Sequence, residues 1–118
     1  MTVLANIVES RRGDVAIARI DGEIDASNVS WIEERLRALV TNEAEALVVD
    51  LTATTYLDSA GVALLFELAA DLRRHQQELR VVVADGSPIA RVLEVTAITG
   101  AAATHPTLDA ALGQQAGS

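Results

Sequence analysis

The chain has 118 residues, half of them hydrophobic, which fits a single domain built around one core. It contains no cysteine and no lysine, its nine basic residues are all arginine, and its formal net charge is −8. These features exclude a disulfide framework, a thiolate metal site and a lysine-dependent phosphate loop, and so acidic a surface argues against binding to nucleic acid or anionic lipid.

The sequence shows no targeting or membrane segment. The first fourteen residues lack the basic leader, apolar stretch and small-residue cleavage site of a signal peptide. The longest apolar run, 61–70, is interrupted by Glu67 and is too short to cross a bilayer. We therefore expect a cytoplasmic protein that does not insert directly into membranes.

The chain opens with the pattern of a β-hairpin. Two stretches rich in β-branched and apolar residues, 3–8 and 15–20, flank a polar turn at 10–14. The pair Asp21-Gly22 then predicts the end of the second strand.

A helix is predicted from about residue 28 to residue 40, where apolar residues recur at helical spacing and charged residues fill most other positions. Asp25, Ser27 and Asn28 are candidate N-caps for this helix. Trp31 lies one position from the apolar stripe, so we expect it to be partly buried rather than to form a contact surface.

The centre of the chain predicts a strand, a long helix and a second strand. The apolar run 46–51 is typical of a strand that is covered on both faces or lies at the centre of a sheet. A broad apolar stripe predicts a well-buried helix over 59–75, with arginines in its last turn, where the helix dipole favours positive charge. The run 79–84 predicts another apolar strand.

Capping signals mark the C-terminal elements. Ser87 and Pro88 suit the cap and the first position of a helix. Residues 101–104 predict a weak edge strand, and Thr107 suits the cap of a short final helix. We expect residues 114–118 to form a flexible tail.

The order of these elements predicts an α/β fold in one domain at 1–113. Strands joined by helices favour parallel pairing with right-handed crossovers, whereas the opening hairpin adds an antiparallel pair. The sequence therefore predicts a mixed sheet.

The residues offer no positive case for an enzyme. Neither His75 nor His105 belongs to a catalytic or metal-binding histidine pattern, and we interpret them as a helix-end cation and a loop residue. Ser59 lies at a strand-to-helix junction, but a nucleophile elbow needs glycine two positions earlier, where Leu57 stands. No base follows at a suitable position, so we expect no catalysis, no metal site and no cofactor.

The stretch Asp58-Ser59-Ala60-Gly61 lies at the predicted mouth of the long helix. We expect the Ser59 hydroxyl to cap the helix by accepting from first-turn amides, which is worth about 1 kcal/mol. A phosphoryl group there would add about −1.5 to −2 charges, which the helix start would tolerate and which Asp58 and Asp25 would repel. Because Gly61 has no side chain, another protein could approach the helix start closely. A simple cap and a phosphorylation switch are both consistent with this corner.

Four segments together span nearly the whole chain: GEIDASN (22–28), VVDLTATTYLDSAGVALL (48–65), VVVADGSPIARVLEVTAITG (81–100) and THPTLDAAL (104–112). Their most specific elements are Gly22-Glu23-Ile24-Asp25 and Asp58-Ser59-Ala60-Gly61. In this order they resemble the STAS domain, in particular the bacterial anti-sigma factor antagonists. The resemblance implies a mixed sheet of four to five strands with about four helices packed mainly on one face.

The resemblance also implies a regulatory function. In this family, the serine after the aspartate is phosphorylated by a partner serine kinase of the GHKL type, which is itself the anti-sigma factor. The unphosphorylated antagonist binds this kinase and frees the sigma factor. Phosphorylation breaks the complex, and a PP2C-type phosphatase restores it.

Carried over to this chain, the resemblance makes Ser59 the phosphoacceptor. Many members have a second hydroxyl residue next to it, but here that position is Ala60, so Ser59→Ala should abolish phosphorylation at this corner. The implied docking surface comprises Asp25, Ala26, Ser27, Asn28, Asp58, Ala60, Gly61 and Val62.

Other functions are compatible with the same fold. The family includes members that are never phosphorylated, such as stressosome scaffolds and accessory subunits of lipid-transport ABC systems, so a constitutive structural subunit is the alternative. A small-ligand or nucleotide sensor is a third interpretation, for which the sequence offers no pocket-forming signal.

Overall fold

The computed structural model describes residues 5–113, without the side chain of Thr99. The tail predicted at 114–118 and the first two residues of the strand predicted at 3–8 lie outside this range. Within it, the chain forms one sheet of six strands, four α-helices and a short 3-10 helix. The predicted α/β fold is thereby confirmed.

Strands β1 (Ala5–Arg12) and β2 (Val15–Ile24) form the predicted antiparallel hairpin. The prediction of a turn over 10–14 is too long, because only two residues separate the strands. An ion pair between Glu9 and Arg35 of the following helix, with Oε2 and Nη2 2.5 Å apart, holds the middle of β1 over that helix.

The predicted strand break at Asp21-Gly22 is wrong. β2 continues through both residues because a strand that we did not predict, β4 (Thr54–Leu57), pairs with its end in parallel. Gly22 adopts a φ of +111°, a conformation open mainly to glycine, where the register of this pair shifts. The buried hydroxyl of Thr54 donates to the Ile20 carbonyl oxygen at 2.7 Å and fixes β4 to β2.

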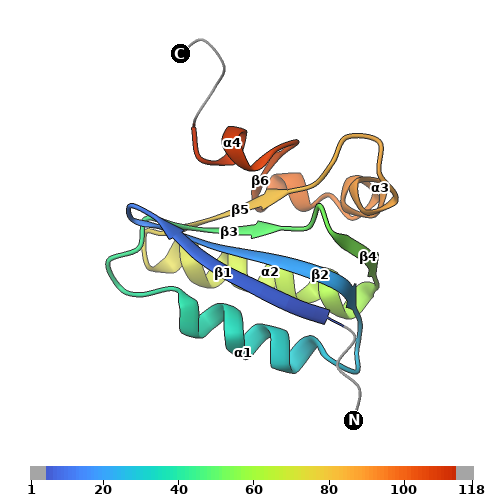
Figure 1. Cartoon of the computed structure of the whole chain (residues 1–118), viewed down its shortest axis with the longest axis horizontal. Helices are drawn as coiled ribbons and strands as arrows, with labels where there is room; N and C mark the ends of the chain where they lie inside the picture. The colour runs from blue at the N-terminus through green and yellow to red at the C-terminus, as the bar shows by residue number, and fades with distance from the viewer. Residues whose placement is uncertain (1–4, 114–118) are drawn as a thin grey trace.

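The strands follow the order β1-β2-β3-β5-β6 across the sheet, with β4 beside the end of β2 (Figure 1). All pairs except β1 with β2 are parallel, which confirms the mixed sheet. The remaining strands are β3 (Ala46–Asp50), β5 (Glu78–Val82) and β6 (Ala103–His105). The helices are α1 (Val29–Leu39), α2 (Ser59–Arg74), α3 (Pro88–Val95), α4 (Leu108–Ala111) and the 3-10 helix Ile98–Gly100.

The main core lies on the side of the sheet where α1, α2 and α3 pack, as the resemblance implied. Alternate residues of β2, β3 and β5 point into it, and the long helices contribute apolar faces at helical spacing. Its members include Ala18, Leu47, Val49 and Val81 from the sheet, Ile32 and Leu36 from α1, Leu65 and Leu68 from α2, and Leu93 from α3.

A smaller core lies on the opposite face under the short helix α4. Ile17, Val48 and Val82 pack there with Ala111, so the central strands are buried on both sides. This explains why β3 reads as a continuous apolar run rather than as an alternating one.

Two predicted caps are present. The Ser87 hydroxyl accepts from the Ala90 amide at 3.1 Å at the start of α3, and Pro88 follows as the first helical residue. The Thr107 hydroxyl accepts from the Ala110 amide at 3.1 Å and starts α4. Local sequence therefore positions both C-terminal helices.

The parallel strands bring their C-terminal ends to one edge of the sheet, at the right of Figure 1. The chain leaves β2 after Ile24 and β4 after Leu57 at this edge. We call it the switch edge, and it comprises the turn 25–28 and the start of α2 at 58–62. Within residues 5–113, no helix combines the length and hydropathy needed to cross a membrane.

Candidate functional site

The turn after β2 and the start of α2 lie side by side at the switch edge. Ile24, the last residue of β2, is paired in register with Leu57, the last residue of β4. The amide of Asp58 donates to the carbonyl oxygen of Ile24 at 3.3 Å and continues this pairing by one residue. The structure therefore brings the predicted residues Asp25 and Asp58 together, although 33 positions separate them in the chain.

Asp58, not Ser59, caps helix α2. Asp58 occupies the N-cap, and its Oδ1 accepts from the amides of Ala60 at 2.9 Å and Gly61 at 3.3 Å. The prediction that the Ser59 hydroxyl caps the helix is wrong because Ser59 is already the first helical residue. The aspartate carboxylate is also the stronger acceptor for amides at the positive end of the helix dipole.

This change of cap leaves the Ser59 hydroxyl unengaged. Ser59 is exposed, and its side chain makes no hydrogen bond within the part of the chain that the structure describes. The hydroxyl is thus open to solvent, and the cap of α2 does not depend on it.

The turn after β2 is built around Asp25. The Asp25 Oδ1 accepts from the Ser27 amide at 2.9 Å and from the Ser27 hydroxyl at 2.5 Å. Donation from the Ser27 hydroxyl, and then from its amide, lowers the pKa of the Asp25 carboxyl below its ordinary value of 3.8. Asp25 is therefore held as a carboxylate at neutral pH and is oriented by its own turn.

Asn28 fastens this turn to the sheet rather than capping α1. Its Nδ2 donates to the carbonyl oxygen of Glu23 at 2.8 Å, and its Oδ1 accepts from the Asp25 amide at 3.0 Å. Asn28 occupies the N-cap position but makes no side-chain cap, so the predicted capping role is wrong for Asn28. The side chain is buried and joins both ends of the turn.

Gly61 serves internal packing. It is buried, and a Cβ at this position would lie 2.9 Å from Ile24 Cγ2 and still closer to Leu57 Cδ1. Our reason for glycine here, close approach by another protein, is therefore incorrect. The missing side chain instead allows the first turn of α2 to seat on the ends of β2 and β4.

The eight residues expected to form the docking surface differ widely in exposure. Ala26 and Ser27 are exposed, and Asp25, Asp58 and Ala60 are half-buried. The other three, Asn28, Gly61 and Val62, are buried. The first five, with Ser59, can meet another molecule through their side chains, and the last three support them from beneath.

Two exposed aromatic residues lie on elements that reach the switch edge. Trp31 keeps 39% of its surface exposed, which is more than we expected. One turn later on the same helix, Arg35 pairs with β1, so Trp31 lies on the β1 side of α1, away from α2. Tyr56 of β4 is 49% exposed and was missed, because β4 itself was not predicted.

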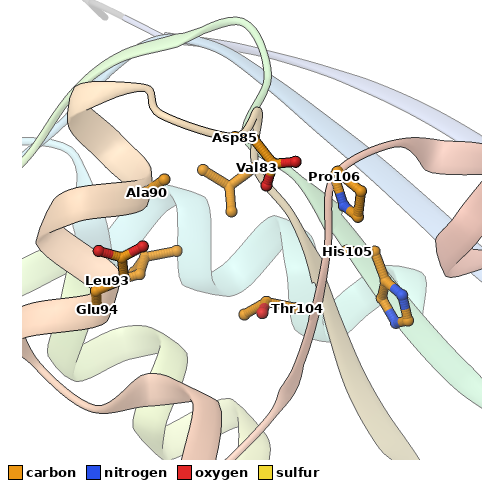
Figure 2. A pocket seen from close by; sticks show the side chains of 8 residues that line it. All are labelled: Val83, Asp85, Ala90, Leu93, Glu94, Thr104, His105 and Pro106. Carbon is orange, nitrogen blue, oxygen red and sulfur yellow. The ribbon is translucent and has the colours of Figure 1, made fainter.

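A hollow that contains two acidic residues and a histidine does not bring these side chains together (Figure 2). A hollow of about 100 Å³ between α3 and β6 is lined by Asp85, Glu94 and His105 among others. Figure 2 shows the two carboxylates on different sides of this hollow and the imidazole directed away from both. No group of three or more acidic, histidine or cysteine side chains within residues 5–113 could hold a metal ion.

The model of one protein family, the STAS domain, matches residues 6–111 of this chain. The chain is 33% identical over 99 residues to the anti-sigma-F factor antagonist RsfB of Mycobacterium tuberculosis, covering 83% of this chain and 79% of that protein. It is 31% identical over 80 residues to the anti-sigma-B factor antagonist of Listeria monocytogenes, covering 68% and 69% of the two proteins.

Solved structures share the fold. An anti-sigma factor antagonist from Mycobacterium paratuberculosis superimposes with a TM-score of 0.82 at 27% identity, covering 92% of both chains. The unphosphorylated form of the anti-sigma factor antagonist SpoIIAA superimposes with a TM-score of 0.72 at 16% identity, covering 92% of this chain and 95% of SpoIIAA. At that identity, the second comparison supports the fold alone.

Replacement of Gly61 tests its packing role. We expect Gly61→Ala to lower the free energy of unfolding by about 1–3 kcal/mol, because the added methyl group collides with Ile24 and Leu57. Helix propensity alone would change stability in the opposite direction by about 1 kcal/mol. Urea denaturation measures the difference. The control is Gly100→Ala, where a Cβ would meet nothing within 4 Å, and equal effects of the two substitutions would contradict the packing role.

Removal of the Ser27 hydroxyl tests the electrostatics of the turn. Ser27→Ala should raise the pKa of Asp25 toward its ordinary value, because the strongest donor to the carboxylate is lost. The wild-type turn contributes stability above the unfolded-state pKa of Asp25 and loses it as pH falls through the lower folded-state pKa. The stability advantage over the variant should therefore shrink on acidification.

Carboxyl NMR titration between about pH 2 and 6 measures the Asp25 pKa directly. Asp21 is the internal control, since Arg19 lowers its pKa and this ion pair does not involve Ser27. An Asp25 pKa that is the same in wild type and Ser27→Ala would contradict this account of the turn.

Proposed function

The chain belongs to the STAS domain family, and we propose that it acts as an anti-sigma factor antagonist controlled by phosphorylation of Ser59. In this proposal the unphosphorylated chain binds an anti-sigma serine kinase of the GHKL type and thereby frees a sigma factor. Two relatives that are more than 30% identical carry the name of anti-sigma factor antagonist, which supports this assignment.

The observation that carries the proposal is the exposed, unengaged hydroxyl of Ser59. A kinase can approach it from solvent. Its modification does not remove a cap, because the Asp58 carboxylate holds the first-turn amides of α2. The fold can therefore survive phosphorylation while its surface changes.

The chemical step would take place in the kinase active site. Ser59 Oγ forms a bond to the γ-phosphorus of ATP, and the bond from that phosphorus to the bridging oxygen breaks. ADP leaves, and the hydroxyl proton passes to a base of the kinase. This chain would contribute the acceptor oxygen on an accessible helix start. No histidine lies within ten positions of Ser59 in the sequence, so we assign the base to the kinase.

Phosphorylation would change the charge of the switch edge sharply. The phosphoryl group adds about −1.5 to −2 charges at neutral pH. The amides of Ala60 and Gly61 already donate to Asp58, so they are not available to neutralise the phosphate. We had expected these amides to accommodate it. Instead, the phosphate would remain at the surface near two carboxylates, those of Asp58 and Asp25.

The same charge would weaken the complex with the kinase. A kinase that transfers a phosphoryl group to Ser59 must hold the nucleotide phosphates next to that hydroxyl. After transfer, phosphoserine and ADP would face each other as like charges across a closed contact. The outward position of the phosphate would also leave it open to a PP2C-type phosphatase, which would restore binding.

Incubation with each anti-sigma serine kinase of the source genome and ATP tests this proposal. We expect phosphate at Ser59 by peptide mass spectrometry, no phosphate in Ser59→Ala, and loss of kinase binding in Ser59→Asp. The matched control is Ser30→Ala, which removes an exposed hydroxyl from α1 and should behave as wild type.

Phosphate found only at other positions, with Ser59→Ala modified as wild type, would refute the proposal. Stable co-purification with an ABC transporter ATPase or a scaffold protein, unaffected by Ser59→Asp, would instead favour a constitutive structural subunit.

A further inference from the structure

The strand before the phosphoacceptor presents an exposed aromatic side chain beside a carboxylate. Tyr56 of β4 and Glu23 of β2 are paired in register on neighbouring strands, which lie about 4.8 Å apart in sheets. Each directly precedes a residue whose side chain enters the main core, Leu57 and Ile24, respectively. Because side chains alternate along strands, Tyr56 and Glu23 point to the opposite face of the sheet from α2.

This pair has no partner in the residues that the structure describes. Tyr56 is the sole tyrosine of the chain and is 49% exposed. Neither its hydroxyl nor the Glu23 carboxylate forms a side-chain hydrogen bond or ion pair within residues 5–113. A half-exposed tyrosine with an unneutralised carboxylate next to it is the combination that binds a guanidinium group, by cation–π contact and by charge.

The chain segments that carry Tyr56 and Glu23 have one sign of charge. Every charged residue from 20 to 34 and from 51 to 72 is acidic. Arg19, the nearest basic residue on β2, is matched by Asp21, with Nε–Oδ1 and Nη2–Oδ2 distances of 2.8 and 3.1 Å. Within residues 5–113, Glu23, Asp25 and Asp58 form no ion pair, so the switch edge favours a basic partner surface.

We propose that Tyr56 and Glu23 form an arginine-binding spot that anchors the anti-sigma kinase on the switch edge. The inference rests on the proposed function and adds a contact that the phosphoacceptor corner does not contain. Tyrosine and arginine are, with tryptophan, the residues that are enriched at the energetic centres of protein interfaces. The kinase would reach around the end of β4, with an arginine on Tyr56 and its nucleotide at Ser59.

In this arrangement, the contact that attracts the kinase and the phosphate that repels it lie at different places. If the cationic contact of the kinase lay at Ser59 itself, a phosphate there would strengthen binding. An arginine that binds Tyr56 and Glu23 lies on the other face of the sheet from α2. It therefore attracts both the unphosphorylated and the phosphorylated chain. The phosphate then acts only against the nucleotide, so phosphorylation can release a partner that an acidic surface recruits.

Binding is measured by calorimetry with the kinase that phosphorylates Ser59 in the experiment above, using variants of the full chain. Tyr56→Ala should raise the dissociation constant about 30-fold, whereas Tyr56→Phe, which keeps the aromatic face, should change it less than about threefold. Glu23→Gln should raise it about five- to tenfold and reduce its dependence on salt. In phosphorylation assays, Tyr56→Ala should raise KM and leave kcat within about twofold of wild type.

Two controls match these changes at other places. Val95→Ala removes a side chain that is 80% exposed on α3, and Glu43→Gln removes an exposed charge between α1 and β3, at the other end of the sheet. Both should bind as wild type. Unchanged affinity of Tyr56→Ala, or equal losses in Tyr56→Phe and Tyr56→Ala, would overturn the inference while the Ser59 switch stands. If no kinase binds the wild-type chain, the proposed function itself fails, and this inference with it.

Discussion

The hydrogen bonds from the Ala60 and Gly61 amides to the Asp58 carboxylate are the interaction on which the rest of the site depends. These bonds pair two amides of the first turn of α2 with the carboxylate of the residue that directly precedes Ser59. As a result, Ser59 is the first residue of the helix, but its hydroxyl takes no part in capping it. A residue that was itself the cap could not be modified without removing a contact worth about 1 kcal/mol.

The position of this cap is set by the sheet. β4 pairs with the end of β2, so the chain enters α2 directly beside the Asp25 turn. Gly61 lets the first helical turn rest on Ile24 and Leu57, and Asn28 ties the neighbouring turn to β2. Backbone pairing, the close packing at Gly61 and the buried side chain of Asn28 thus hold the Asp25 turn beside the helix start that carries the free hydroxyl.

Much of the fold could be predicted because its signals are local. The caps of α3 and α4 lie at Ser87 and Thr107, as expected, and the apolar run of β3 correctly indicated a strand buried on both faces. β4 was missed because it has four residues, two of them exposed, and becomes a strand only through pairing with β2. For the same reason Asp21-Gly22 suggested a break where the strand continues.

The residues that meet at this corner of the fold could be picked out from the sequence, but their separate structural roles could not. Asp58 and Ser59 are both good N-cap residues, and sequence alone does not say at which of them the helix begins. Gly61 was correctly identified as a position that requires glycine. The requirement comes from close packing against Ile24 and Leu57, which are distant in sequence from each other. Tyr56 carried no signal until the partner strand showed which way its side chain points.

The measurement that tests this account most directly compares the unfolding free energies of Asp58→Ala and Ser59→Ala. If Asp58 is the cap, its replacement should lower stability by about 1–2 kcal/mol. Loss of the free Ser59 hydroxyl should change stability by less than about 0.5 kcal/mol. A Ser59→Ala protein that is destabilised as much as Asp58→Ala would show that the serine holds the helix, and the account of a free hydroxyl on an independent cap would be wrong.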